Sequence, residues 1–530
     1  NEIERVGSSE RVKMVAQIDR LEGVQGDKGS SARRFYITRD QDLNSIGSQM
    51  VEDLGEVDMD DSQTLTDFAV WAIQTYPADR YVLILSDHGM GWPGGWTDAT
   101  PAEEPIQFIN TAQMDQALQT IVEQTGIGQF ELIGLDACLM SMLEIYNALA
   151  PYSHYALASE EVEPGIGWAY TAALNVLVEN PQISGAELAK AFVDTYVDQD
   201  QRIVDKAARA AFIARYAYPP GTSAEELIDN FSAQITLTAL DLSRLPQVNQ
   251  ALNALLVEAK NVDPKLVANV RSYARPFTSV YGENIPSPYI DLGNFAALLA
   301  EKSSTSGIEE AAFNLRTAIE TATIAERHGP QRQGASGISI YFPTSELYWS
   351  DTLAGFSVYQ QISSRFADNT LWDDFLAFHY AGVEFGQGKP SREQRLPAPG
   401  AAQVNIDPLV LSSDRISAGQ ELNLRTHISG EQIAYIYLMT LYKKDDNNYL
   451  VYNLDYIQGD VNQEVDGVYH PVWQREDGLI PINLTWTPLA DGICDGSLCA
   501  FNLLEPESYG ANKDDIIYSI IGKYISGGYG

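Results

Sequence analysis

Short, continuously apolar runs alternate with amphipathic stretches through residues 1–170. The runs at 81–87 and 130–136 lack the alternation of a half-exposed strand, so we expect strands that are buried on both faces of a sheet. The amphipathic stretches between them have the spacing of helices that cover such a sheet. The pattern predicts an α/β core with a mainly parallel sheet flanked by helices. Further strands are expected at 11–19, 34–39 and 155–160, and helices at 64–76, 111–126 and 138–150.

The rest of the chain divides into three regions. Residues 171–385 have mostly helical spacing, and we interpret them as an extension that completes the first unit. Residues 386–403 are rich in Gly, Pro and Ser and predict a linker. Residues 404–530 carry short strands between turn residues, which predicts a C-terminal β-sandwich. The chain opens on a helix tail and ends on a strand-like stretch. We therefore expect that an upstream segment, including any signal peptide, is missing, and that the last domain is incomplete.

Composition and charge narrow the function classes. Of 530 residues, 45% are hydrophobic and 20% are charged, as in an ordinary globular protein of more than one domain. The formal net charge of −38 argues against nucleic-acid binding, which requires clustered Lys and Arg. No apolar run approaches the roughly 18 residues of a membrane span. The scattered acidic residues are typical of a solubilising surface, with a cationic partner as the alternative.

The three cysteines fall into a pair and a single residue. Cys494 and Cys499 flank a turn-like DGSL segment. A small disulfide loop there would favour an exported protein, and two free thiols are the alternative. Cys138 stands alone after the apolar run 130–136, where a helix is expected to begin. An unpaired cysteine in such a position is a candidate reactive thiol.

Two strand ends carry residues that can do chemistry together. His88 follows one apolar run and Cys138 follows another. If the strands are parallel neighbours, both side chains leave the same edge of the sheet. A helix N-terminus at Cys138 and a nearby imidazole would favour the thiolate that cysteine chemistry needs. The N–H groups of Gly89 and Cys138 are expected to form an oxyanion hole.

Each residue alone also has an ordinary interpretation. A Cys at the end of a buried strand is often an inert small hydrophobe, and a single His is often a polar surface group. Other cysteine chemistries do not fit, because no C-x-x-C includes Cys138 and Glu144 stands where a phosphatase-like loop would end in Arg. Taken together, however, His88 lies 50 residues before a Cys that is preceded by Ala, which is the spacing described for caspases.

The sequence also resembles a known family, the clostripain-like cysteine peptidases, which belong to the same caspase-fold clan as gingipains, legumains and caspases. The His-Gly and Asp-Ala-Cys segments are specific when they occur together. The resemblance implies a caspase-like fold and a cysteine endopeptidase. It rests on YPADRYVLILSDHGMGW (76–92), LDACLMSMLEIYNAL (135–149), ASEEVEPGIGWAY (158–170), YIDLGNFA (289–296) and GISIYFP (337–343), with weaker likeness at 473–488.

The resemblance also implies roles for single residues. Cys138 is expected to attack the peptide carbonyl and form a thioester, and His88 to act as general base and acid in a dyad. Asp136 matches the acidic residue that lines a pocket for Arg or Lys at P1 in such enzymes. Glu160, Glu161 and Glu163 are expected to add negative charge there, with a solvated acidic loop as the alternative.

Several features depart from the family pattern. The loop 97–108 contains no Lys or Arg, so self-cleavage after a basic residue in this loop is not expected. Ala169 stands where some relatives have a polar or acidic residue, which weakens the Arg/Lys assignment. Calcium is associated with some relatives. The carboxylate clusters at 40–45 and 58–61 do not form an EF-hand loop, so no metal ligand is assigned and no cofactor is expected for the chemistry.

The sequence therefore predicts an exported or cell-surface cysteine peptidase of bacterial type. The expected partners are peptide or protein substrates, without nucleic acid and without a membrane span. A non-catalytic surface or assembly protein, which keeps the fold as a scaffold beside a β-sandwich binding module, is the alternative. The presence of both Cys138 and His88 favours the enzyme.

Overall fold

The computed structural model describes most of the chain up to residue 396 and separate strands beyond it. The described residues are 2–19, 31–42, 45–98, 107–216, 218–219, 221–282, 285, 287–303, 305–396, 404–408, 410–413, 415–416, 421–430, 437–443, 449–456, 464–465, 467–470, 479–486, 491–494, 498–502 and 516–519.

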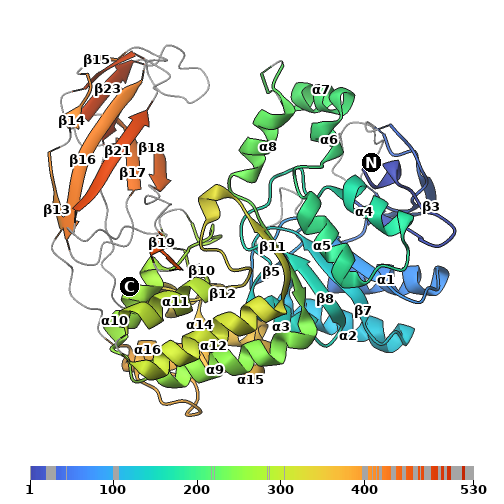
Figure 1. Cartoon of the computed structure of the whole chain (residues 1–530), viewed down its shortest axis with the longest axis horizontal. Helices are drawn as coiled ribbons and strands as arrows, with labels where there is room; N and C mark the ends of the chain where they lie inside the picture. The colour runs from blue at the N-terminus through green and yellow to red at the C-terminus, as the bar shows by residue number, and fades with distance from the viewer. Residues whose placement is uncertain are drawn as a thin grey trace.

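A five-stranded sheet lies at the centre of the molecule, in the order β11-β9-β8-β7-β4 (Figure 1). The strands β4 (Val82–Ser86), β7 (Phe130–Asp136) and β8 (Ser153–Ala158) are parallel neighbours. The strands β9 (Thr236–Asp241) and β11 (Thr323–His328) pair antiparallel with their neighbours. The expected α/β class is confirmed. The sheet is mixed rather than mainly parallel, because two strands from the region interpreted as a helical extension complete it.

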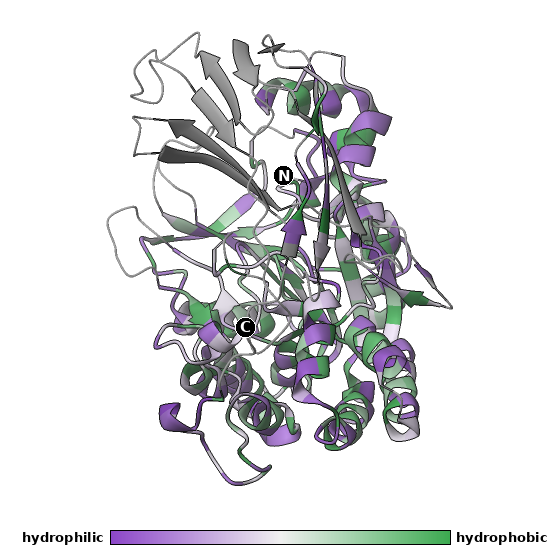
Figure 2. Ribbon diagram, turned by 90° about the vertical axis from the view of Figure 1, so that its left-hand side faces the viewer, coloured by the Kyte–Doolittle hydropathy of each residue, from purple (hydrophilic) through white to green (hydrophobic). Residues whose placement is uncertain are grey.

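Helices cover both faces of this sheet. One face packs on the larger hydrophobic cluster, to which α1 (Ser62–Thr75), α2 (Thr111–Thr125), α3 (Leu143–Leu149), α9 (Leu245–Ala259), α10 (Pro264–Tyr273), α11 (Leu292–Lys302), α12 (Ser306–Ala322), α13 (Ser345–Tyr348), α14 (Phe356–Ile362), α15 (Ser364–Asn369) and α16 (Trp372–Ala381) contribute. The other face packs on a second cluster, with residues from α4 (Tyr170–Glu179), α5 (Gly185–Thr195), α6 (Gln201–Val204), α7 (Lys206–Arg215) and α8 (Ala224–Ser232). In Figure 2, hydrophilic and hydrophobic positions lie on different sides of the long helices, as expected for surface helices.

The two-sided burial explains why β7 is apolar along its length. Leu132 points into the second cluster, whereas Ile133 and Leu135 point into the larger one, because successive side chains of a strand face opposite ways. Gly134 leaves room for an indole, since a Cβ there would lie 2.9 Å from the ring of Trp168. The continuously apolar run is therefore the sequence of a central, doubly covered strand.

The first strands of the chain do not join the central sheet. The strands β1 (Val15–Ile18), β2 (Ala32–Tyr36) and β3 (Gln49–Gly55) form a separate antiparallel sheet. Two further short antiparallel pairs lie close to the strand ends where chemistry is expected. They are β5 (Gly94–Gly95) with β6 (Ile109–Asn110), and β10 (Tyr289–Asp291) with β12 (Ser339–Tyr341).

The C-terminal region is β-rich, and most of its strands lie apart from the helices in Figure 1, whereas β20 (Val468–Tyr469) contacts α11. The expected linker, residues 386–403, includes η4 (Arg392–Gln394). Its residues 397–403 lie outside the described part of the chain. A β-sandwich in this region stays a prediction. The strands are β13 (Val404–Ile406), β14 (Val410–Leu411), β15 (Arg415–Ile416), β16 (Leu422–Gly430), β17 (Tyr437–Lys443), β18 (Tyr449–Tyr456), β19 (Glu464–Val465), β20 (Val468–Tyr469), β21 (Leu479–Trp486), β22 (Asp491–Cys494), β23 (Leu498–Asn502) and β24 (Ile516–Ser519).

Within the described residues, no helix has both the length and the apolar character needed to cross a membrane.

Replacement of Leu135 by Ala tests the packing of β7. Leu135 is fully buried, so Leu135→Ala should lower the free energy of unfolding by about 2–5 kcal/mol through lost burial and a residual cavity. Val82 on the adjacent strand is 40% exposed, and Val82→Ala should cost about 0.5 kcal/mol or less. Urea unfolding followed by tryptophan fluorescence measures both changes. Equal losses for the two variants would contradict the proposed burial.

Candidate active site

The parallel pairing of β4 with β7 brings His88 and Cys138 to one edge of the sheet. Ser86 pairs with Asp136 at the end of the two strands, and each chain then continues for two residues to His88 and Cys138. The backbones stay in contact there, because a Cβ on Gly89 would lie 2.2 Å from the carbonyl oxygen of Cys138. The expectation that both residues leave neighbouring parallel strands at the same edge is therefore confirmed.

The turn that carries His88 is closed by backbone hydrogen bonds. The N–H of Trp96 donates to the carbonyl oxygen of His88 at 2.9 Å, and the N–H of Met90 donates to that of Gly94 at 2.8 Å. The side chain of His88 is exposed at the surface of this turn. The turn thus leaves the His88 imidazole exposed, and the next residue, Gly89, lies against the Cys138 backbone.

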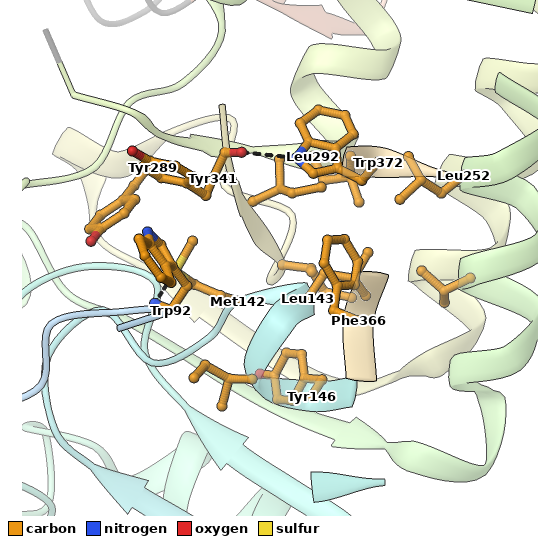
Figure 3. Packing of buried hydrophobic residues seen from close by; sticks show 14 of the residues in the cluster. Trp92, Met142, Leu143, Tyr146, Leu252, Tyr289, Leu292, Tyr341, Phe366 and Trp372 are labelled. Carbon is orange, nitrogen blue, oxygen red and sulfur yellow. Dashed lines mark hydrogen bonds between the residues drawn. The ribbon is translucent and has the colours of Figure 1, made fainter. Parts of the chain in front are cut away.

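A buried aromatic core contains residues of both turns. Figure 3 shows Trp92, which follows His88, and Met142, which follows Cys138, near Tyr289 and Tyr341. The backbone N–H of Trp92 donates to Sδ of Met142 at 3.1 Å, and the hydroxyl of Tyr289 donates to the carbonyl oxygen of Met90 at 2.6 Å. The indole of Trp92 packs against the ring of Tyr341, with centroids 5.2 Å apart. Met142 follows Cys138 in the chain, so this core fixes the His88 turn against the Cys138 turn.

The helix expected to begin at Cys138 begins only at Leu143, with Met142 as its N-cap residue. Residues 139–141 bond elsewhere: the N–H of Leu139 donates to the carbonyl oxygen of Glu161 at 3.2 Å, and that of Ser141 to the carbonyl oxygen of Ser159 at 2.8 Å. Leu139 also has φ +67°, a left-handed conformation that is uncommon for a non-glycine residue. The expectation of a helix N-terminus at the thiol is wrong, because these bonds replace the first helical turn.

The surroundings of Cys138 favour the neutral thiol. Burial raises the pKa of the half-buried Cys138, the N–H of Glu163 lowers it by donating to Sγ at 3.4 Å, and the charge of Glu161 raises it. Hydrogen bonding from the backbone N–H groups of Cys138 and Gly89 also lowers this pKa, but the net shift is upward. The expected bias towards thiolate is therefore wrong for the free enzyme, and the thiol needs a base.

Three backbone N–H groups lower the pKa of the Cys138 thiol, and among them that of Glu163 donates a hydrogen bond to Sγ at 3.4 Å. Two of them, from Gly89 and Cys138, are the pair expected for an oxyanion hole, and both interact with Sγ in this structure. The third, from Glu163, was not anticipated. A backbone donor leaves no mark on the amino-acid sequence, so sequence patterns had no means to identify it.

Asp136, two residues before Cys138, is buried in an acidic cluster at the end of β7. Its carboxylate accepts hydrogen bonds from the hydroxyls of Tyr170 at 2.7 Å and Ser86 at 3.2 Å. Glu163 lies next to it and accepts a hydrogen bond from Nε1 of Trp168 at 2.9 Å. Burial and the charge of Asp136 raise the pKa of Glu163 well above its usual value, so the two carboxyl groups hold a proton between them.

The nearest cation is already paired with other acidic residues. Arg202 binds the carboxylate of Asp200, and its guanidinium lies 3.3 Å from the carboxylate of Glu2. Among these described groups, the acidic residues outnumber the basic one. The described groups around Asp136 thus carry an excess of negative charge.

Glu160 and Glu161 do not line an open surface. Glu160 is fully buried, accepts a hydrogen bond from the N–H of Gly337 at 3.1 Å, and has a pKa raised by burial and by Asp291. Glu161 is buried in an ion pair with Arg332, 2.6 Å between the charged atoms. Their assignment to substrate binding is corrected, and so is the alternative of a solvated acidic loop, because both carboxyl groups bond inside the protein.

Other sequence-based expectations have mixed outcomes. Ala169 is fully buried, so it presents no group to a substrate. The loop 97–108 and the cluster at 40–45 lie partly outside the described residues. Within the described parts of the chain, no group of three His, Cys, Asp or Glu side chains is arranged to hold a metal ion, the cluster at 58–61 included.

A sequence model of the clostripain family matches residues 4–379 of this chain. The match covers more than two thirds of the 530 residues and includes both strand ends described above. Among proteins with curated descriptions, none matches the sequence significantly.

Solved structures of C11 proteases share a limited structural likeness with the chain. A secreted C11 cysteine protease from Bacteroides thetaiotaomicron, in complex with an irreversible peptide inhibitor, is 17% identical, with a TM-score of 0.46; the likeness covers 69% of this chain and 92% of that one. An inactive zymogen C11 protease from Parabacteroides distasonis is 15% identical, with a TM-score of 0.45; the likeness covers 71% of this chain and 90% of that one. With such TM-scores, the family assignment rests on the sequence match.

Substitution of Gly89 tests the contact between the two turns. Gly89→Ala places a Cβ against the Cys138 carbonyl oxygen and displaces the Gly89 N–H from the sulfur. Alkylation of Cys138 by iodoacetamide at pH 8 should become about twofold to tenfold slower, the loss expected for a hydrogen bond that contributes about 0.5–1.5 kcal/mol. A Cβ on Gly165 meets nothing within 4 Å, so Gly165→Ala is the matched control. Mass spectrometry gives the rates, and unchanged alkylation of a folded Gly89→Ala protein would rule out the contact.

Proposed function

The chain belongs to the clostripain family of cysteine peptidases, and from that membership we propose that it cleaves peptide bonds through a Cys138–His88 dyad. The observation that supports the proposal is the in-register end of β4 and β7, two residues before His88 and Cys138, together with the Gly89 backbone that lies against Cys138. A peptidase site needs a nucleophile, a base within reach, and donors for the oxyanion. A cysteine, a histidine and backbone N–H groups at this edge of the sheet support the proposal.

The reaction follows from these groups. His88 takes the proton of the Cys138 thiol as Sγ attacks the carbonyl carbon, and the N–H groups of Gly89 and Cys138 stabilise the oxyanion. The intermediate collapses to a thioester, and the departing amine takes the proton from the His88 imidazolium. His88 then removes a proton from water, the hydroxide attacks the thioester, and the thiolate leaves and is reprotonated. Because the free thiol has a raised pKa, proton transfer to His88 accompanies attack.

The acidic groups Asp136 and Glu163 support a preference for Arg or Lys at P1. Asp136 stands two residues before the nucleophile, and the described cations near it are bonded to other acids. A guanidinium or ammonium entering beside Asp136 and Glu163 would form charge-assisted hydrogen bonds and release their shared proton. Of the three glutamates expected to add negative charge, Glu163 lies beside Asp136, whereas Glu160 and Glu161 bond elsewhere in the protein.

Export is a further proposal. In the β22–β23 pair, Cys494 is directly opposite Cys499, the arrangement that a small disulfide loop requires. Their side chains lie outside the described ones, so the disulfide stays a prediction. The proposed steps use groups of the chain alone, and a role for calcium stays unassigned.

Substitutions in the dyad test the mechanism. Cys138→Ala should reduce peptide cleavage to background, since the nucleophile is lost, and His88→Asn should lower kcat/KM by about 10²–10⁴-fold, since the base is lost. His154 is exposed on β8, so His154→Asn is the control and should retain full activity. Initial rates on a fluorogenic peptide measure all three. Cleavage by a purified Cys138→Ala protein at the normal rate would refute the dyad.

The P1 preference has a separate test. In a peptide series varied at P1, Arg and Lys should be cleaved fastest, and Asp136→Asn should lower kcat/KM for them by about 10- to 100-fold, the value of a charge-assisted hydrogen bond of about 1.5–3 kcal/mol. Cleavage after uncharged P1 residues should change little. Asp194 on α5 is exposed, so Asp194→Asn is the control. A preference for acidic or small P1 residues would overturn the pocket assignment and leave the dyad intact.

A further inference from the structure

Three segments that are distant in the chain interlock behind the thiol. The turn 138–142 donates two backbone hydrogen bonds to the segment 159–163, from Leu139 and Ser141. The hydroxyl of Ser141 donates to the carbonyl oxygen of Gly337 at 2.6 Å, and the N–H of Ser339 donates to that of Ser141 at 2.9 Å. The position of the thiol therefore depends on contacts with two other parts of the chain.

The third segment comprises residues 330–339. One buried ion pair joins it to the segment 159–163. Arg332 lies in η3 (Pro330–Arg332), and its Nε donates to the Glu161 carboxylate at 2.6 Å, with both residues buried. Its other nitrogens donate to Gln234 at 3.0 Å and to a carbonyl oxygen of its own turn. The Glu161 carboxylate also accepts from the N–H groups of Val162 and Thr278. This carboxylate is thus bonded on all sides.

The backbone around Glu161 reaches the reacting atoms. Its carbonyl oxygen accepts the N–H of Leu139, the left-handed residue that follows Cys138. Two residues further on, the N–H of Glu163 donates to Sγ of Cys138. A strained backbone conformation persists only where the surrounding structure holds it. The anchor on the Glu161 side chain therefore acts on both the Cys138 turn and a donor to its sulfur.

We propose that Arg332 is a positioning residue for the reaction, which holds the segment 159–163 through Glu161 so that the segment presents the Cys138 thiol in its reactive geometry. The proposal rests on the proposed role of Cys138 as nucleophile. Arg332 does not touch the substrate in this scheme. It acts through Glu161, 171 residues away in the chain, and a loosened segment lets both the turn and the Glu163 donor shift.

The segment that carries Arg332 is itself supported from the C-terminal region. The ring of Tyr469, in β20, lies where a Cβ on Gly334 would come within 2.6 Å, and its carbonyl oxygen accepts a hydrogen bond from Asn294 at 2.8 Å. Glycine suits position 334 for two reasons: a Cβ would collide with the ring of Tyr469, and the backbone has φ +88°, which favours glycine. His470 pairs with Glu301 at 3.0 Å beside it. The contact with Gly334 supports the Arg332 segment, and the other two contacts hold residues 469–470 against α11.

Full-length variants of the ion pair test the proposal. Arg332→Gln should lower kcat/KM by about tenfold to 100-fold, mainly through kcat, because displacements of about 1 Å at a reacting group have such effects. Arg332→Lys keeps the charge and should recover part of the rate. Arg365 forms an ion pair with Asp115 at 2.7 Å that bonds to none of the three segments, so Arg365→Gln is the matched control with unchanged kcat.

The pH dependence of Cys138 alkylation separates positioning from a general loss of stability. Of the described titratable groups, Glu161, Glu163 and Tyr196 interact with the charge of this thiol, and Asp136 and His88 lie at or just beyond the ends of the adjacent strands. In Arg332→Gln the Glu161 charge loses its counter-ion, so the alkylation profile should move to higher pH. In Glu161→Gln a negative charge is removed, so the profile should move to lower pH. A merely structural role for the pair predicts no such opposite shifts.

The outcomes are distinct. Reduced kcat in both variants, with opposite shifts of the alkylation profile, supports the proposal. Wild-type kcat in Arg332→Gln, a loss equal to that of Arg365→Gln, or alkylation profiles that do not move would overturn it. If Arg332→Gln does not fold, Arg332→Lys and Glu161→Gln decide the question by the same measurements. Full activity of Cys138→Ala would instead refute the proposed function, so the two failures are told apart.

Discussion

The contact between the backbones of Gly89 and Cys138 is the constraint on which the rest of the site depends. The hydrogen bonds between parallel strands β4 and β7 continue as far as Ser86 and Asp136. Beyond these strand ends, the backbones of Gly89 and Cys138 are still in contact. Such a close approach leaves no room for a side chain at position 89. Because the approach also aims the Gly89 N–H at the sulfur, one packing requirement supplies a donor for an oxyanion.

The turns that follow β4 and β7 are held in place because both pack into a buried hydrophobic core. Trp92 and Met142 come from the two turns and meet in this core (Figure 3). Glu144 lies below them, fully buried, and accepts hydrogen bonds from the N–H of Tyr341 at 2.9 Å and the hydroxyl of Tyr359 at 2.8 Å. Burial raises the pKa of Glu144 to about 7. A carboxyl group in such surroundings serves packing, since it reaches neither the thiol nor the surface.

The electrostatics of the site suit a substrate that brings its own positive charge. Burial of Cys138 disfavours a thiolate in the free enzyme, and the charge of Glu161 acts in the same direction. A basic P1 side chain would offset part of that negative charge and so favour thiolate formation when the substrate is bound. The same carboxyl groups that recognise the substrate would then also make the thiol reactive in its presence.

The sequence by itself determined the α/β class and the two parallel strand ends that are followed by His88 and Cys138. Apolar runs and fixed spacing report burial and strand order, and both are local properties of the chain. It misjudged what surrounds Cys138: the helix starts at Leu143, and Glu160 and Glu161 turn inwards. Tertiary structure decided these points, because the bonds that replace a helical turn and the cation that buries Glu161 come from segments distant in the chain. Arg332 lies 171 residues from its partner, a distance over which no local pattern carries information.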